Sequence, residues 1–166
     1  IVSKLAKIKE IYQYKLFSKK NQNIFETART FVRKNLNIEV ESNPIISINS
    51  QKVADAKSKY KILDSEKNIL LGVGGSGPTK RVSPEKFIEL IKLCSENFKC
   101  KFFLAAGTND VEEQIIKKIL NSEHGKKCTA LNKLKISEII PIIKNCNISV
   151  CNDTSFSHLS AALGIN

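Results

Sequence analysis

The sequence lacks methionine, and it lacks any long apolar run. No stretch approaches the roughly 18 apolar residues that a membrane-spanning helix needs, so the sequence predicts no such helix. No signal-peptide pattern is visible either. Because the chain starts at Ile1 and has no methionine, we expect it to be a piece of a longer protein.

Cysteines are few, and their spacing is wrong for a structural site. The five lie at positions 94, 100, 128, 146 and 151, an odd number without a CxxC pair. A disulfide framework or a zinc site would need closer pairing, and His124 with Cys128 is only a weak candidate for a metal. We therefore expect free thiols, no metal and a reducing cytoplasmic environment.

Acidic residues are in short supply. The chain has 27 Lys and Arg against 16 Asp and Glu, a formal net charge of +11, and the excess lies mainly in residues 1–63. Such an excess favours nucleic acid, an anionic membrane face or a phosphorylated substrate, although a solvated lysine-rich surface explains it equally well. No zinc-finger, helix-turn-helix or aromatic RNA-binding pattern is present, so we expect no nucleic-acid partner.

The first 47 residues differ in pattern from the rest. Residues 1–20 fit a helix or a strand about equally well. Residues 23–35 predict an amphipathic helix, and residues 44–48 predict an extended linker. The inner face expected for that helix consists of Ile24, Phe25, Ala28, Phe31 and Val32.

From residue 48 onward, short apolar runs alternate with helical patterns. This alternation predicts a parallel sheet with helices on both faces, an α/β fold. Ligands of such folds bind at the carboxyl ends of the strands, so the turns that follow the strands should carry the function. We expect strands over 68–73, 101–106, 127–131 and 148–151, and helices over 51–61, 83–97, 110–120, 136–144 and 154–163.

The first of these turns is rich in glycine. Gly72, Gly74 and Gly77 formally match GxGxxG. In a dinucleotide-binding turn the helix starts within the glycines, whereas here it should start near Ser83. The turn also fails as a P-loop, because Pro78 stands where that motif requires lysine.

What remains of this turn is a flexible loop with hydroxyls and cations. Ser76 and Thr79 supply hydroxyls, and Lys80 and Arg81 supply positive charge. A phosphate-bearing ligand suits such a loop, because cations and backbone N–H groups offset its charge. A plain glycine-rich connection is the alternative interpretation.

Two further turns carry polar residues. Asp110, after the second strand, is suited to capping the next helix, or to contacting a sugar hydroxyl. Asp153, Thr154 and Ser155 precede a helix of small residues whose N-terminus offers unpaired N–H groups to an anion. His158 lies one turn further on the face of Thr154, although an ordinary capped helix would look the same.

Taken in order, the segments GGSGPTKRVSP and DTSFSHLSAALG resemble the donor domain of glycosyltransferase family 9, the bacterial heptosyltransferases. The resemblance covers residues 68–166 well and residues 1–50 loosely. It implies a GT-B fold with two Rossmann-like domains. Residues 1–47 would be the tail of the N-terminal acceptor domain and the linker, and residues 48–166 a truncated C-terminal nucleotide-sugar-binding domain.

The resemblance also implies roles for individual residues. Thr79 and Lys80 would contact the donor diphosphate, and Leu134 would lie beside the adenine. Ser155 stands where the family usually has glycine, and Val82 where it has an aromatic residue, which leaves the donor sugar open. The residues expected to bind the donor are Ser76, Thr79, Lys80, Asp110, Leu134, Asp153, Thr154, Ser155 and His158.

The implied reaction is inverting sugar transfer from a nucleoside-diphosphate donor, usually ADP-heptose, to a lipopolysaccharide core acceptor. Neither a metal nor another cofactor is expected, because Lys80 and the helix N-terminus can stabilise the leaving diphosphate. The family's general base belongs to a region that this sequence does not contain, so no catalytic residue is expected here. The lipid-linked acceptor implies peripheral contact with the cytoplasmic face of the inner membrane. A related nucleotide-sugar enzyme, such as an epimerase, and a non-catalytic nucleotide-binding protein are the alternatives.

Overall fold

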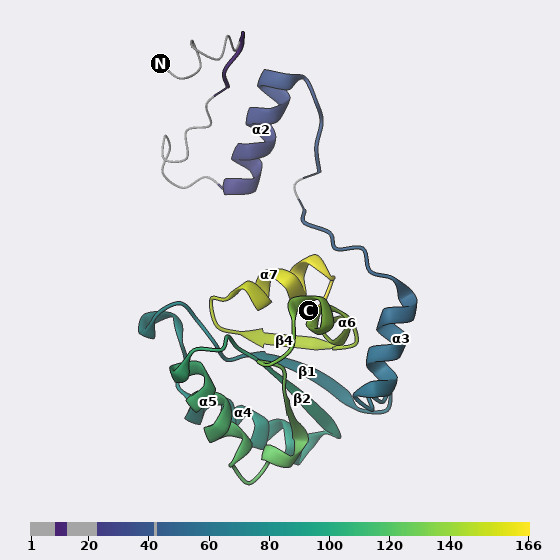
Figure 1. Ribbon diagram of the computed structural model, residues 1–166, viewed down its shortest axis with the longest axis vertical. Helices are drawn as coiled ribbons and strands as arrows, with labels where there is room; N and C mark the ends of the chain where they lie inside the picture. Colours follow the sequence, from purple (N-terminus) through teal and green to yellow (C-terminus); the bar gives the residue numbers. More distant parts are fainter. Residues whose placement is uncertain (1–8, 13–22, 42) are drawn as a thin grey trace. The chain divides into compact units, whose positions relative to one another are not determined.

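The computed structural model describes residues 9–12, 23–41 and 43–166 (Figure 1). The chain divides into two compact units, Ile1–Pro44 and Ile45–Asn166. Within the described ranges no helix is long and apolar enough to cross a membrane. The expectation for residues 1–20 falls mostly outside the described residues, and residues 9–12 form neither helix nor strand.

The first unit contains the helix α2 (Ile24–Leu36), close to where the sequence predicts it. The Asn23 side chain caps its start by accepting a hydrogen bond from the Phe25 amide at 2.9 Å. The expected burial of its apolar face is wrong, because α2 has no buried residue, and Ile24 and Phe25 are 55% and 50% exposed. In the described part of this unit, α2 is the only helix or strand.

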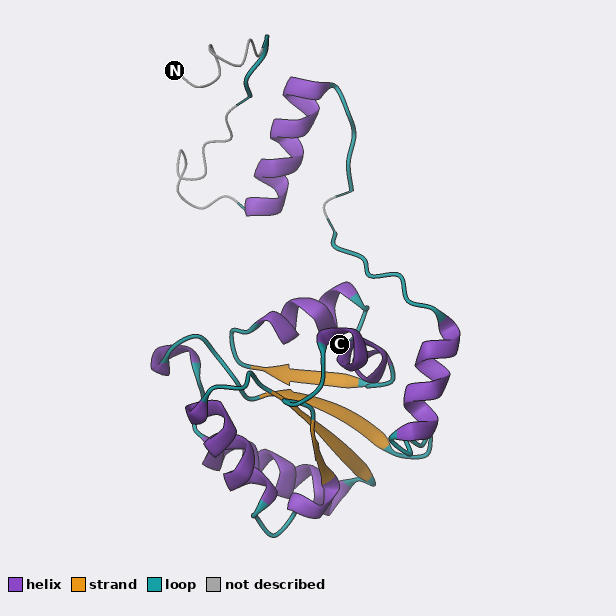
Figure 2. Ribbon diagram, viewed as in Figure 1, coloured by secondary structure: helices purple, strands orange, loops and turns teal. Residues whose placement is uncertain are grey.

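The second unit is an α/β layer structure, as the alternating pattern predicts (Figure 2). Its four strands are all parallel, in the order β3-β2-β1-β4. The strands are β1 (Lys67–Gly72), β2 (Cys100–Ala105), β3 (Cys128–Ala130) and β4 (Ile148–Cys151). The helices are α3 (Ser50–Lys59), α4 (Pro84–Asn97), α5 (Asp110–Leu120), α6 (Ile136–Lys144) and α7 (Ser155–Ala162), with short 3-10 turns η1 (Pro78–Lys80) and η2 (Gly125–Lys127).

The two central strands are buried on both faces. Leu70 and Phe103 point into the core beneath α3, α6 and α7, while Leu71 and Phe102 point into the core beneath α4 and α5. All four side chains are fully buried. This burial explains why these strands are continuous apolar runs in the sequence rather than alternating ones.

The strand order reverses at β1. The chain runs from β1 to β2 to β3 on one side, and β4 then pairs with β1 on the other side. In a doubly wound sheet such a reversal opens a crevice at the carboxyl ends of the two strands. The loop after β1 (residues 73–83) and the turn after β4 (residues 152–154) therefore face each other across the natural ligand position.

Candidate functional site

A cleft of about 660 Å³ opens at the carboxyl edge of the sheet. It is bounded on one side by the loop after β1 and on the other by the first turn of α7. Its apolar wall includes Leu134, from the segment between β3 and α6, and Ile139 of α6. The lining comprises residues 74–76, 106–109, 112, 132, 134, 136, 139, 153–156 and 158.

The first turn of α7 presents backbone donors to this cleft. Thr154 caps the helix, and its Oγ1 accepts a hydrogen bond from the Phe156 amide at 2.9 Å. The Ser157 hydroxyl donates to the Thr154 carbonyl at 2.6 Å, which closes the same turn. In the described part of the chain, the amides of Thr154 and Ser155 have no protein acceptor. These N–H groups lie at the positive end of the helix dipole, so the turn favours an anion.

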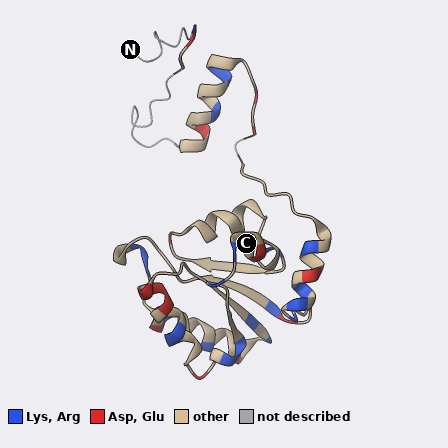
Figure 3. Ribbon diagram, in the orientation of Figure 1, with Lys and Arg blue, Asp and Glu red and all other residues tan. Residues whose placement is uncertain are grey.

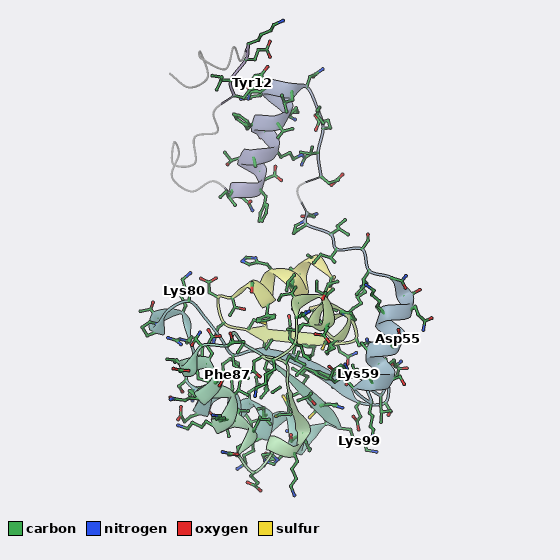
Figure 4. All side chains as sticks on the ribbon, in the orientation of Figure 1. Tyr12, Asp55, Lys59, Lys80, Phe87 and Lys99 are labelled. Carbon is green, nitrogen blue, oxygen red and sulfur yellow. The ribbon has the colours of Figure 1, made fainter. Side chains whose placement is uncertain are left out.

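An ion pair joins the two sides of the cleft. Lys80 Nζ in η1 lies 2.6 Å from Asp153 Oδ2, with both side chains about half exposed; Lys80 is labelled in Figure 4. The hydrogen bond from Lys80 and its positive charge lower the pKa of Asp153, and the nearby His158 lowers it further. The ammonium group of Lys80 is therefore held next to the N-terminus of α7.

Most of the residues expected at the site do meet in this cleft. Ser76, Leu134, Asp153, Thr154, Ser155 and His158 all line it. Thr79 and Lys80 lie outside the lining, in η1, and Lys80 reaches it through Asp153. Asp110 is exposed and does not line it.

The expectation that Asp110 caps α5 is wrong by one residue. Asn109 has the extended backbone of a cap, and its side chain accepts a hydrogen bond from the Glu112 amide at 3.0 Å. Asp110 is the first residue of the helix. Figure 3 shows the acidic start of α5, whose first turn contains Asp110, Glu112 and Glu113.

Sequence reasoning missed Asn152, which is 6% exposed. Its Nδ2 donates to the carbonyls of Val73 at 3.0 Å and Gly74 at 3.2 Å, and its Oδ1 accepts from the Val82 amide at 3.1 Å. Asn152 thus holds both ends of the loop after β1 against β4. Its position directly before Asp153 and Thr154 was the available signal, but three adjacent cap-forming residues looked interchangeable.

Sequence reasoning also missed Glu112, another buried polar residue of the cleft. Its carboxylate accepts hydrogen bonds from the amides of Gly75, at 3.0 Å, and Gly107. The signal was the spacing of Asn109 and Glu112, which matches a capping box. In a capping box the carboxylate returns to the amide of the capping residue, whereas here it bonds to two neighbouring loops.

The cysteines offer no reactive centre in the described residues. All five are free. Burial raises the pKa of the Cys128 and Cys146 thiols to about 12, and it also raises the pKa of Cys94 and Cys151. These four thiols stay protonated at neutral pH. The described residues contain no cluster of three or more metal-ligating side chains.

Solved structures share this fold. Heptosyltransferase II of E. coli, an ADP-heptose lipopolysaccharide heptosyltransferase, matches 86% of this chain at 18% identity and a TM-score of 0.66. E. coli heptosyltransferase WaaC with ADP matches 89% of the chain at 22% identity and a TM-score of 0.61. A family 9 glycosyl transferase from Veillonella parvula matches 89% at 16% identity and a TM-score of 0.73.

The chain spans less than half of each of these structures, 45%, 44% and 43% of their respective lengths. Comparison with curated proteins gives no match. The model of glycosyltransferase family 9 (heptosyltransferase) matches residues 8–165, which is nearly the whole chain. This match, together with a parallel sheet shared with heptosyltransferases, shows that the chain belongs to glycosyltransferase family 9.

Proposed function

We propose that this chain is the donor-binding part of a heptosyltransferase. It binds a nucleoside-diphosphate sugar, ADP-heptose, in the cleft at the carboxyl edge of the sheet. One observation carries this proposal: at the start of α7, the Thr154 and Ser155 amides have no acceptor among the described residues, and Asp153, the residue before them, holds the ammonium group of Lys80. The solved structure of E. coli WaaC with ADP-2-deoxy-2-fluoro heptose, a protein of the same fold, supports the choice of donor.

The chemistry follows from where charge develops. When the bond from the sugar to the diphosphate breaks, the leaving diphosphate gains negative charge. The Thr154 and Ser155 amides and the Lys80 ammonium are fixed donors that stabilise this charge in the transition state. Because these groups supply the positive charge, we propose that transfer needs no metal ion.

The acceptor is the second substrate, and its activation is the part of the reaction that we assign to residues outside this chain. We propose a lipopolysaccharide core hydroxyl as the acceptor, with inversion at the sugar carbon. We assign the base that removes the acceptor proton to residues outside this chain. An acceptor of this kind is linked to lipid, so the enzyme would work at the cytoplasmic face of the inner membrane.

Calorimetric titration of the chain with ADP tests the proposal. Lys80→Ala should weaken ADP binding by ~1–3 kcal/mol, as expected for a lost hydrogen bond to a charged group. Lys86→Ala is the matched control, since Lys86 pairs with Glu89 on α4 at 2.8 Å and does not line the cleft. If the unsubstituted chain does not bind ADP, the proposal fails, and equal affinities of the two variants would remove Lys80 from the site.

A further inference from the structure

Glu112 is a buried carboxylate that the proposed reaction does not use. It is 6% exposed and belongs to the first turn of α5, yet it borders the cleft. Its Oε1 accepts a hydrogen bond from the Gly75 amide at 3.0 Å, and its Oε2 accepts one from the Gly107 amide. The carboxylate therefore bridges the loop after β1 and the loop after β2, which are 32 residues apart in the sequence between these two amides.

A buried carboxylate is costly unless something compensates its charge. Here two backbone N–H groups do so, and the N-terminal end of the α5 dipole adds to their effect. Both oxygens are directed at the loops rather than at a lysine or arginine side chain. The charged carboxylate of Glu112 thus binds the backbone amides of two loops.

Two glycines make room for this carboxylate. A methyl group on Gly74 would lie 2.9 Å from Glu112 Oε2, and one on Gly107 would lie 2.5 Å from the same oxygen. Both distances are shorter than real packing allows, so any side chain at these positions would displace the carboxylate. Gly74 belongs to the GxGxxG-like spacing of the sequence. Because it has no side chain, it leaves room for the Glu112 carboxylate.

We propose that Glu112 is a positioning residue for the donor diphosphate. By fixing the Gly75 amide, it sets the path of residues 74–76 along the edge of the cleft, so that this loop and the start of α7 face the diphosphate together. This role rests on the proposed nucleotide-binding function. It concerns the part of the cleft lined by residues 74–76 and by the start of α7, because the bonds of Glu112 go to the Gly75 and Gly107 amides.

Glu112→Gln tests this role at the level of the contact itself. Glutamine has only one acceptor oxygen, and its NH2 group would face the second amide N–H, donor against donor. In an NMR spectrum of the variant, at least one of the Gly75 and Gly107 amide protons should move upfield, because its charged acceptor is lost. The matched control is Glu113→Gln, the same substitution one residue later, and it should leave both resonances in place.

The same variants test the effect on the nucleotide. Glu112→Gln should weaken ADP binding about tenfold but leave adenosine binding unchanged, because the held loop serves the phosphates. Glu113→Gln should change ADP affinity by less than about twofold. A general loss of structure would weaken both ligands alike. If Glu112→Gln does not fold, Glu112→Asp decides: it keeps the charge but is too short to reach both loops, and the same selective loss is expected.

The outcomes of these experiments separate the role of Glu112 from the proposed function. Unmoved Gly75 and Gly107 resonances in Glu112→Gln, or an ADP affinity equal to that of the unsubstituted chain, would overturn the role of Glu112 and leave the proposed function standing. Equal losses for ADP and adenosine would also overturn it. If the unsubstituted chain fails to bind ADP, the proposed function is lost, and the positioning role is lost with it.

Discussion

The two segments that face each other across the reversal of strand order are built in opposite ways. The loop after β1 runs from residue 73 to 83, and its only regular structure is the 3-10 turn Pro78–Lys80. The turn after β4 has three residues, and Thr154 closes it with its own side chain and carbonyl. The short turn is closed by local bonds of Thr154 with the start of α7, whereas buried side chains from other elements hold the ends of the long loop.

Those outside contacts come from both flanks of the loop. Glu112 of α5 holds the Gly75 amide from the β2 side. Asn152 holds the Val73 and Gly74 carbonyls and the Val82 amide from the β4 side. The lesson is that a long glycine-rich loop with only one short 3-10 turn can be well positioned, provided that buried polar side chains satisfy its backbone.

Asn152→Ala should have the largest effect on stability. It leaves two buried carbonyls and one amide without their partner, and we expect a loss of about 2–4 kcal/mol in urea unfolding. The long loop should loosen before the rest, so trypsin should cut faster after Lys80 and Arg81. Asn97→Ala, which removes an exposed bond to the Leu93 carbonyl on α4, is the control and should cost about 0.5 kcal/mol or less. Unchanged cleavage at Lys80 and Arg81 would show that the loop holds itself.

Thr154→Ala should have a smaller and more local effect. Removing the hydroxyl that accepts from the Phe156 amide should cost ~1 kcal/mol, the usual value for a lost helix cap. Thr154→Ser keeps the hydroxyl and should restore most of this stability. Tryptic cleavage after Arg81 should not change in either variant, because the long loop does not depend on this cap. Faster cleavage there would mean that the long loop depends on the Thr154 cap, contrary to the comparison.

Much of the second unit could be predicted from the sequence because its signals are local. The strands are short apolar runs. The helix α4 begins directly after Ser83, with Pro84 at its first position, although the Ser83 side chain makes no capping hydrogen bond, and α7 begins after its cap Thr154. That these turns meet at one edge follows from the parallel topology alone. The fold was therefore predictable, and so was the general place of the site.

The contacts of Glu112 and Asn152 could not be predicted in the same way. The bond from Gly75 to Glu112 spans 37 residues, and the bond from Val82 to Asn152 spans 70. Whether a polar side chain points to water or to a distant loop depends on tertiary packing, which no local pattern encodes. The amphipathic pattern of α2 likewise predicted a helix correctly but gave no information on what would cover it.

The smallest expected effect concerns the ion pair that links the two segments. Lys80 lowers the pKa of Asp153 through its hydrogen bond and its charge, so Lys80→Gln should raise that pKa toward its ordinary value. Since the folded-state pKa is depressed, the ion pair stabilises the protein above the unfolded-state pKa, and this stabilisation is lost as the pH falls through the folded-state value. NMR titration of the Asp153 carboxyl carbon measures the shift, with Lys86→Gln as a control that should instead raise the pKa of Glu89. If Asp153 titrates in the same way with and without Lys80, the two segments do not interact electrostatically. Glu112 and Asn152 would then remain as the contacts that position the long loop.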